Sequence, residues 1–400
     1  MNDINFAWPT TAINRDDMLA FDEWFEKIGK NKAKIYIFGA GIRGSEFAYF
    51  LQLKGYIDFE FIDNNKEKCG GHIDGKRIFA VSDVISDITC GKAIILISVE
   101  MAKPIVHQLN ELGLLEEKHF YQIRNKQYDN YVGEFFREIP SDHYLIFGDC
   151  MFSSVSIYDK NFSNLSEIIK EKVGYDKCKI LYMHGMGIRA FYNILILYCE
   201  VVGIPRKVEL MVNFETLTGT QHLMPRSQHN ELFHLLLKSI NNANDEFCEY
   251  VKITDSRANN SQIEISHKTK NLTKEQERAI KNRNYLRLNY MYKFNENVEG
   301  MIYFKKIVKY AKEKNIELIP FVPPVNFELG NFYFGNKFND AYDSNLDKLK
   351  IICDDQKVRL VDLSHVFSKD YFAEKDTTDE SLNESGRQIV AEKLIANLVE

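Results

Sequence analysis

The sequence predicts an α/β protein with two parallel-sheet domains. Short apolar runs rich in Val, Ile and Phe recur along the chain, and most are followed by a glycine or polar turn and then by a helical pattern. Such alternation is typical of parallel sheets covered by helices on both faces. A length of 400 residues favours two or more domains. We expect domains at 33–130 and 143–400, a helix within 1–32 and a linker at 131–142.

Composition argues against several classes of function. The chain has 51 Lys+Arg and 57 Asp+Glu, a net charge of -6, which offers no basic surface for nucleic acid. No apolar run approaches the roughly 20 residues of a membrane span, and the start of the chain lacks the features of a secretory signal. Seven scattered cysteines indicate reduced thiols. We expect a cytoplasmic protein that binds a small molecule or glycan, with no prediction of its oligomeric state.

The first domain begins with a strand, a glycine turn and a helix. A leading helix is expected at about 14–30, a strand at 34–38 and a helix at 45–54. A second strand at 59–63 ends in an acid about twenty residues beyond the glycine turn. Further strands are expected at 77–81 and 93–98, and a further helix at 103–112.

The glycine turn is a candidate nucleotide site. Gly39 permits the tight turn, Gly41 lets backbone N–H groups approach a phosphate, and Gly44 allows the helix to pack close to the strand. Arg43 lies within the loop, and Asp63 stands where a dinucleotide fold holds a ribose hydroxyl. The alternative, in which the glycines serve only the turn, stays open.

Residues 33–125 resemble the short Rossmann-like domains attached to bacterial sugar-modifying enzymes, including sialic-acid and bacillosamine O/N-acetyltransferases. The resemblance depends on the loop 39–44, the strand end Ile62-Asp63-Asn64 and the turn 71–75. It implies that the glycine loop holds a nucleotide or sugar-nucleotide, often without a redox cofactor.

The second domain is expected to start at His143. Its apolar runs predict strands at 144–147, 179–183, 207–212, 316–322 and 358–362. The interval between the third and fourth strands is too long for a simple connection. We therefore expect a helical insertion at about 218–300, with helical patterns at 230–238 and 273–281.

The second domain resembles the SGNH/GDSL hydrolases. The segment Phe147-Gly-Asp-Cys-Met-Phe-Ser-Ser154 is similar to their first block, and the stretches 361–367 and 382–394 are similar to the way they end. The resemblance covers 143–400 and implies a flavodoxin-like, three-layer fold with the nucleophile at Cys150. Serine is the usual nucleophile, and the histidine expected near 378–381 is absent. Asp379 and Glu380 lie beside its place and could act as acid or base.

Side chains that meet at a site in a parallel sheet come from the carboxyl ends of its strands. This rule selects Asp149 and Cys150 after the first strand, His184 and Gly185 after the second, and Asn213 after the third. A thiol is more acidic and more nucleophilic than a hydroxyl, so a Cys150–His184 pair could work without the usual histidine. The resemblance implies that Gly185 and Asn213 stabilise an oxyanion. Cys150 could instead fill a tight turn, and His184 could cap a helix or a strand-end carbonyl.

Three functions compete. The first is an acyltransferase or esterase acting on a sugar or cell-surface glycan precursor, with acyl-CoA as a possible donor; a Gly-x-Cys strand end also resembles a capsule-biosynthesis acetyltransferase family. The second is a catalytically inactive carbohydrate-binding protein. The third, an NAD-dependent sugar oxidoreductase, is least favoured because no recognisable hydride-transfer constellation follows the first domain. No metal site is expected, because His222, His229 and His234 lack suitable spacing.

Overall fold

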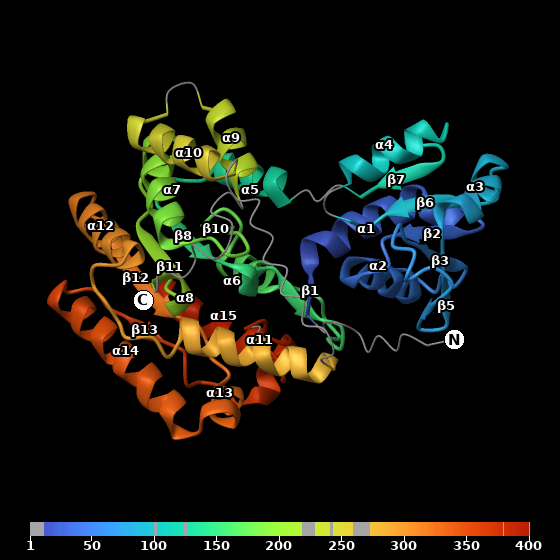
Figure 1. Cartoon of the computed structure of the whole chain (residues 1–400). Coiled ribbons are helices and arrows are strands. Elements are labelled where there is room, and N and C mark those ends of the chain that lie inside the picture. Colours follow the sequence, from blue (N-terminus) through green and yellow to red (C-terminus); the bar gives the residue numbers. More distant parts are fainter. Residues whose placement is uncertain are drawn as a thin grey trace. The chain divides into compact units, whose positions relative to one another are not determined.

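The computed structural model describes residues 12–99, 102–123, 127–217, 229–240, 243–258, 273–378 and 380–399 (Figure 1). The chain forms two compact units, Met1–Lys126 and Gln127–Glu400. Mixed α/β structure with mostly parallel sheets, as the sequence predicts, is confirmed. None of the helices in these ranges combines the length and apolar character required to cross a bilayer.

The first unit contains a six-stranded sheet. Its order is β4-β5-β3-β2-β6-β7, and all neighbours are parallel except the β4–β5 hairpin. The strands are β2 (Ile35–Phe38), β3 (Phe59–Ile62), β4 (His72–Ile73), β5 (Lys76–Phe79), β6 (Ile94–Ile97) and β7 (Phe120–Gln122). Preceding or connecting them are β1 (Ala12–Asn14), α1 (Arg15–Lys27), η1 (Gly29–Asn31), α2 (Ile42–Leu53), α3 (Val81–Thr89) and α4 (Lys103–Glu111).

Helices cover both faces of this sheet. Phe38 of β2 packs in one cluster with Val84 of α3 and Leu109 of α4. On the other face, Phe21 of α1 contacts Phe47 of α2 with ring centroids 5.7 Å apart, and α1 and α2 lie side by side in Figure 1. The leading helix is therefore part of the core of the first unit.

The second unit is built on a five-stranded parallel sheet of order β10-β8-β11-β12-β13. The strands are β8 (Tyr144–Gly148), β10 (Cys178–Tyr182), β11 (Lys207–Met211), β12 (Glu317–Val322) and β13 (Val361–Asp362), and a short strand β9 (Ser154–Ser156) follows η2 (Cys150–Phe152). The five predicted strands of this unit are all present. The helices are α5 (Gln127–Phe136), α6 (Leu165–Val173), α7 (Ile188–Val201), α8 (Phe214–Leu217), α9 (Asn230–Lys238), α10 (Asp245–Ala258), α11 (Lys274–Asn289), α12 (Glu299–Glu313), α13 (Phe327–Phe334), α14 (Asn336–Asp355), η4 (Lys369–Tyr371) and α15 (Glu384–Val399).

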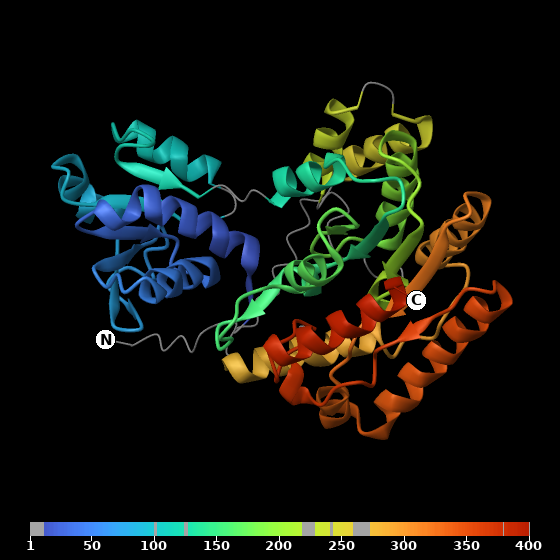
Figure 2. The ribbon, with the colours of Figure 1, turned by 180° about the vertical axis from the view of Figure 1, so that it is seen from behind.

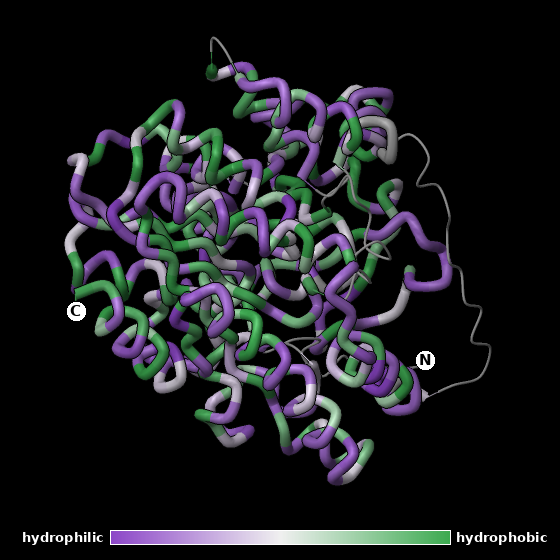
Figure 3. Tube along the Cα trace, turned by 90° about the vertical axis from the view of Figure 1, so that its left-hand side faces the viewer, coloured by the Kyte–Doolittle hydropathy of each residue, from purple (hydrophilic) through white to green (hydrophobic). Residues whose placement is uncertain are grey.

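Alternate residues of β8 face two separate cores. Phe147 packs with residues of α7 and α12 on one face, whereas Ile146 packs with residues of α6 and α15 on the other. Figure 2 shows the second face, with α15 in red. Hydrophobic stretches, green in Figure 3, run through the interior of the trace, and hydrophilic stretches are frequent on its outer turns. The sheet is thus enclosed by helices, and its carboxyl edge is where polar side chains gather.

The stretch expected to be a linker, 131–142, contains the second half of α5. Tyr131 and Phe135 lie four residues apart on one helical face, and both are buried in the core of the second unit. The units divide at 126, and only the part around Pro140 lacks helix or strand. The predicted insertion contains α9, α10 and α11, and its first residues, 218–228, lie outside the described residues.

A buried ion pair fixes the carboxyl-terminal segment of the second unit. Arg387 in α15 is 0% exposed, and its Nη1 lies 2.7 Å from Asp159 Oδ2. The same guanidinium donates to the carbonyls of Ser163 (3.0 Å) and Leu382 (2.8 Å). The segment that precedes α15 is therefore held against the loop after β9.

Candidate functional site

The strand ends of the second unit bring three predicted site residues to one edge of the sheet. The β8–β10 register pairs Gly148 with Tyr182, so Cys150 and His184 each lie two residues beyond this pair. The β8–β11 register puts Asn213 level with Cys150. Cys150, His184 and Asn213 therefore follow the carboxyl ends of three adjacent strands at the same level. This is the edge at which ligands bind in open parallel sheets.

Cys150 begins η2, immediately after β8. Asp149 precedes it with extended backbone, and its Oδ1 accepts a hydrogen bond from Met151 N at 2.9 Å, which caps the short helix. The hydroxyls of Ser153 and Ser154 donate to the Cys150 carbonyl at 3.1 and 2.8 Å. Asp149 thus has a local structural role, and the partly exposed Cys150 stands on a tightly bonded turn.

His184 lies on the exposed turn after β10, followed by Gly185 at φ +66°. The buried His229 donates Nε2–H to the His184 carbonyl at 2.7 Å, and this hydrogen bond stabilises the turn. Burial lowers the pKa of His229 to about 4, so its ring is neutral at pH 7. The His184 ring lies close enough to Glu215 to influence that carboxyl group. The Cys150–His184 pair itself stays a prediction.

Asn213 and Glu380 form a buried pair. Asn213 Nδ2 donates to Glu380 Oε2 at 2.9 Å, and both residues are buried. Asn213 Oδ1 accepts from Glu215 N at 3.0 Å, which fixes the orientation of the amide. Glu380 therefore uses one of the two Asn213 N–H groups, and the predicted oxyanion role falls to the other. Asp379, named with Glu380 from the sequence, lies outside the described residues.

Sequence reasoning missed Tyr285. This residue comes from α11, in the insertion, and its hydroxyl donates to Glu215 Oε2 at 2.8 Å. Burial first, then the charges of Glu380 and Glu215, raises the pKa of Tyr285, and the Cys150 thiol contributes in the same direction. Tyr285 therefore lies near both acidic side chains and near Cys150. Tyr285 lies within the long insertion, and no sequence spacing links a residue there to the ends of the strands.

The glycine loop of the first unit has the predicted tight geometry. Gly39 has φ +114°, and a Cβ on Gly44 would lie 1.9 Å from the Gly39 carbonyl oxygen. Gly41 is the N-cap of α2 and has no side-chain cap, and a Cβ added to it would meet no atom within 4 Å. The strand-to-helix turn thus requires Gly39 and Gly44, whereas the space at Gly41 is compatible with an approaching phosphate.

The two side chains predicted to assist this loop have partners within the first unit. Asp63 Oδ2 accepts from Ala40 N at 3.0 Å and lies 3.1 Å from Lys68 Nζ. Arg43 Nη2 lies 2.9 Å from Asp17 Oδ1 of α1. These contacts stabilise the turn and the leading helix, and the predicted ribose and phosphate roles stay predictions.

We expect Gly44→Ala to destabilise the first unit by about 1–3 kcal/mol, because its Cβ would collide with backbone. Gly41→Ala is the matched control in the same loop and should cost under about 1 kcal/mol, since nothing lies near the added methyl group. Urea unfolding followed by the fluorescence of the buried Trp24 measures both variants. Equal losses would contradict the packing role assigned to Gly44.

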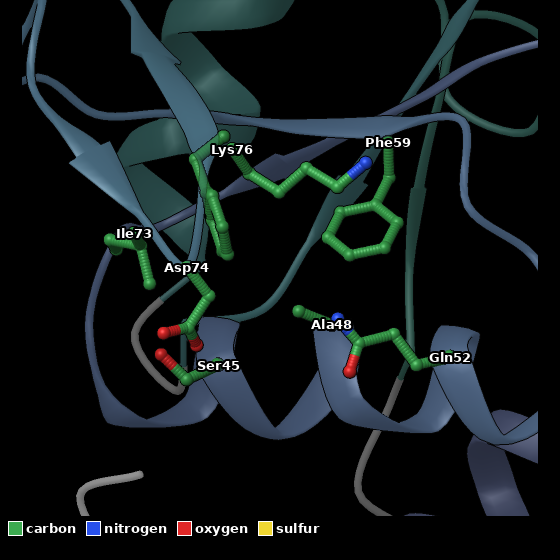
Figure 4. Close-up of a pocket in the computed structure, with 8 residues that line it drawn as sticks. Ser45, Ala48, Gln52, Phe59, Ile73, Asp74 and Lys76 are labelled. Atoms are coloured by element: carbon green, nitrogen blue, oxygen red, sulfur yellow. The ribbon is translucent and has the colours of Figure 1, made fainter. Parts of the chain in front are cut away.

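A depression beside α2 does not extend this site. About 200 Å³ of empty space lies between α2 and the β4–β5 hairpin (Figure 4), and it is lined by Ser45, Ala48, Gln52, Phe59, Phe61, Ile73, Asp74 and Lys76. Lys76 extends over Phe59, with Nζ 4.5 Å from the ring centroid, and donates to the Ile57 carbonyl. Much of this space is open to solvent, and the cavity volume is only about 10 Å³, roughly enough for one water molecule. We therefore assign it no ligand.

Across the described ranges, no three His, Cys, Asp or Glu side chains are arranged to hold a metal ion. His229 is buried under the His184 turn and His234 lies in α9, while His222 falls outside the described residues. None of the seven cysteines, all within the described ranges, forms a disulfide.

No protein-family model matches the chain, and a search of curated proteins finds no match. The geometry of the two units is therefore the basis for a functional proposal.

Proposed function

We propose that the second unit is an acyltransferase or esterase acting on a sugar or cell-surface glycan precursor, with Cys150 as nucleophile and His184 as general base. The observation that carries the proposal is the level arrangement of Cys150, His184 and Asn213 at one sheet edge. The strand order, second-first-third-fourth-fifth, is that of flavodoxin-like sheets. This order supports an SGNH-like assignment, which rests otherwise on sequence resemblance.

The chemistry follows from the residue types. The Cys150 thiol gives its proton to His184, and Sγ forms a bond with the acyl carbon while the acyl oxygen becomes an oxyanion. The remaining Asn213 N–H and the backbone N–H of Gly185 are the proposed oxyanion donors. The leaving group departs with the proton from His184. A sugar hydroxyl or water then gives its proton to His184 and attacks the acyl carbon, the Sγ–carbon bond breaks, and Cys150 regains the proton from His184.

For the first unit we propose a Rossmann-like role in holding a nucleotide or nucleotide-linked group, with acyl-CoA a possible donor for the reaction. Support comes from the open space at Gly41 and from the uncapped start of α2, which offers backbone N–H groups to an anion. The cytoplasmic location and the absence of nucleic-acid partners stay predictions from the sequence.

A carbohydrate-binding protein without catalysis is the second candidate. The observation that favours it is the carboxyl group of Glu380 near the place where the related hydrolases have a histidine, because an acid hydrogen-bonded to Asn213 does not restore the usual triad. An NAD-dependent oxidoreductase is the third, and titration with NAD followed by absorbance and mass spectrometry tests it.

Intact-protein mass spectrometry after incubation with acetyl-CoA, and separately with an activated ester, tests the main proposal. We expect an acyl adduct on the wild type that is lost in Cys150→Ala and reduced in His184→Ala, because the thiol carries the acyl group and the imidazole accepts its proton. Cys90→Ala is the matched control, since Cys90 is an exposed thiol of the first unit.

An adduct that disappears in Cys90→Ala and persists in Cys150→Ala would contradict the assigned nucleophile. A wild type without any adduct, which still binds a sugar as tightly as Cys150→Ala does, would instead favour the carbohydrate-binding protein.

A further inference from the structure

Glu380 places a carboxyl group in the interior of the site edge. The residue is 9% exposed, and the segment that carries it is held by Arg387 through the Leu382 carbonyl. Its two oxygens are not equivalent. Oε2 accepts the hydrogen bond from Asn213 Nδ2, whereas Oε1 is buried without a hydrogen-bond partner among the described residues. Buried polar atoms normally have partners, so Oε1 is the atom of Glu380 suited to meet a ligand.

The groups that interact with Glu380 come from three further elements. Asp149, which caps η2, and Glu215 of α8 act on Glu380, and Glu380 in turn acts on Tyr285 of α11. The Tyr285 hydroxyl donates a hydrogen bond to Glu215, and His184 influences Glu215 from the turn after β10. Glu380 is therefore the most enclosed member of a group of acids.

Burial, followed by the charges of Asp149 and Glu215, raises the pKa of Glu380 well above its ordinary value. The hydrogen bond from Asn213 opposes this only in part. Because the Asn213 N–H occupies Oε2, the proton of a neutral Glu380 belongs on Oε1. A carboxylic acid kept neutral in this way can donate a hydrogen bond where a carboxylate could only accept one.

We propose that Glu380 is a hydrogen-bond donor of the active site, and that its Oε1–H stabilises the acyl oxygen while Cys150 attacks. This inference depends on the acyl transfer proposed above and assigns to Glu380 a role in it. Glu380 thus adds a neutral donor to the oxyanion donors expected from Gly185 and Asn213. It does not replace the missing histidine as a base.

The proton of Glu380 stays on Oε1 throughout the step and is hydrogen-bonded to the acyl oxygen. As the Sγ–carbon bond of Cys150 forms, the carbonyl electron pair moves to the acyl oxygen, and the Oε1–H hydrogen bond strengthens as that charge grows. When the leaving-group bond breaks, the pair returns to the carbonyl and the leaving group takes the proton held by His184. Glu380 ends the step protonated, as it began.

Infrared spectroscopy tests the protonation state without any substrate. We expect the full-length wild type at pH 7 to show carbonyl stretching bands of protonated carboxylic acids, and Glu380→Gln to lose one of them while the band of Glu209 persists. Glu209→Gln is the control, because Glu209 is another buried acid, in the middle of β11, and its loss should remove its own band and leave the Glu380 band in place.

Acylation by the activated ester tests the role. Glu380→Gln should retain most of the rate of adduct formation, because its amide can accept from Asn213 and present N–H at the Oε1 position. Glu380→Leu removes the donor and should slow adduct formation by about 10²–10³-fold. Cys150 should be alkylated in both variants at the wild-type rate, because each change replaces a neutral Glu380 side chain with another neutral one.

Equal loss of acylation in Glu380→Gln and Glu380→Leu would overturn the proposal, because it would show that a carboxylate is required. Identical infrared spectra of wild type and Glu380→Gln would overturn it as well. If the band is present but wild type forms no adduct, acyl transfer fails and the donor role with it, whereas the neutral state of Glu380 stands.

Discussion

Replacing Arg387 with methionine is expected to lower the free energy of unfolding of the second unit by about 3–5 kcal/mol, because the change leaves Asp159 as a buried charge without its cation. The Asp159 side chain is 3% exposed and lies 2.7 Å from the guanidinium. Methionine fills much of the volume, so the loss reflects the charge and the three carbonyl contacts of Arg387, to Ser163, Leu382 and Asn161. Hydrogen–deuterium exchange of α15 peptides and urea unfolding followed by circular dichroism measure it.

Glu392→Gln provides the matched control on the same helix. Glu392 pairs with Lys172 of α6 at 3.7 Å, but the two side chains are 67% and 43% exposed. Exposed pairs contribute about 0–1 kcal/mol. If Arg387→Met cost no more than Glu392→Gln, the guanidinium would not be what holds the segment that carries Glu380.

Glu209→Gln is expected to stabilise the second unit, and by more at higher pH. Glu209 is 0% exposed in the middle of β11, and neither carboxyl oxygen has a hydrogen-bond partner among the described residues. Burial raises its pKa well above the ordinary value, and the nearby Asn397 amide and the charges of Lys207 and Arg359 oppose this only in part. The folded protein therefore keeps a proton that the unfolded chain releases.

The sign of the pH dependence follows from this raised pKa. Below the pKa of Glu209 in the unfolded chain, about 4.3, this residue is neutral in both states and does not oppose folding. The free energy of unfolding then falls as pH rises toward the pKa of Glu209 in the folded protein. The advantage of Glu209→Gln should thus grow by up to about 1.4 kcal/mol per pH unit above pH 5. Urea unfolding at pH 5, 6 and 7 measures the difference in free energy of unfolding between Glu209→Gln and the wild type. Glu317→Gln is the control, because the Glu317 side chain on β12 is 54% exposed. A difference between Glu209→Gln and wild type that does not change with pH would contradict a protonated Glu209.

The longer strands were predictable, whereas two short strands of the first unit were not. Buried strands of a parallel sheet are continuous apolar runs, which is why 144–147 and 207–212 could be recognised from sequence. The pair His72–Ile73 and the strand Phe120–Gln122 are too short to show a period. In α5, the helical spacing of Tyr131 and Phe135 was outweighed by Pro140 and the polar residues around it, so the helix was assigned to a linker.

The candidate site was predictable where it depends on strand ends. Cys150, His184 and Asn213 follow apolar runs directly, and parallel pairing brings such positions together. The partnership of Tyr285 with Glu215 depends on how an insertion folds over the edge, which no local pattern encodes. Glu380 could be named beside the missing histidine, but its hydrogen bond to Asn213 and its enclosure are visible only in three dimensions.

The rate at which Cys150 is alkylated at pH 7 tests the central claim, a nucleophilic thiol activated by His184, most directly. The thiolate is the reactive form of cysteine, so fast alkylation at pH 7 requires a base that accepts the thiol proton. Peptide mapping compares Cys150 with the exposed Cys90 of the same molecule. The account predicts that Cys150 reacts faster than Cys90 at pH 7 and that His184→Ala abolishes the difference. Alkylation of Cys150 only at alkaline pH, unaffected by His184→Ala, would contradict it.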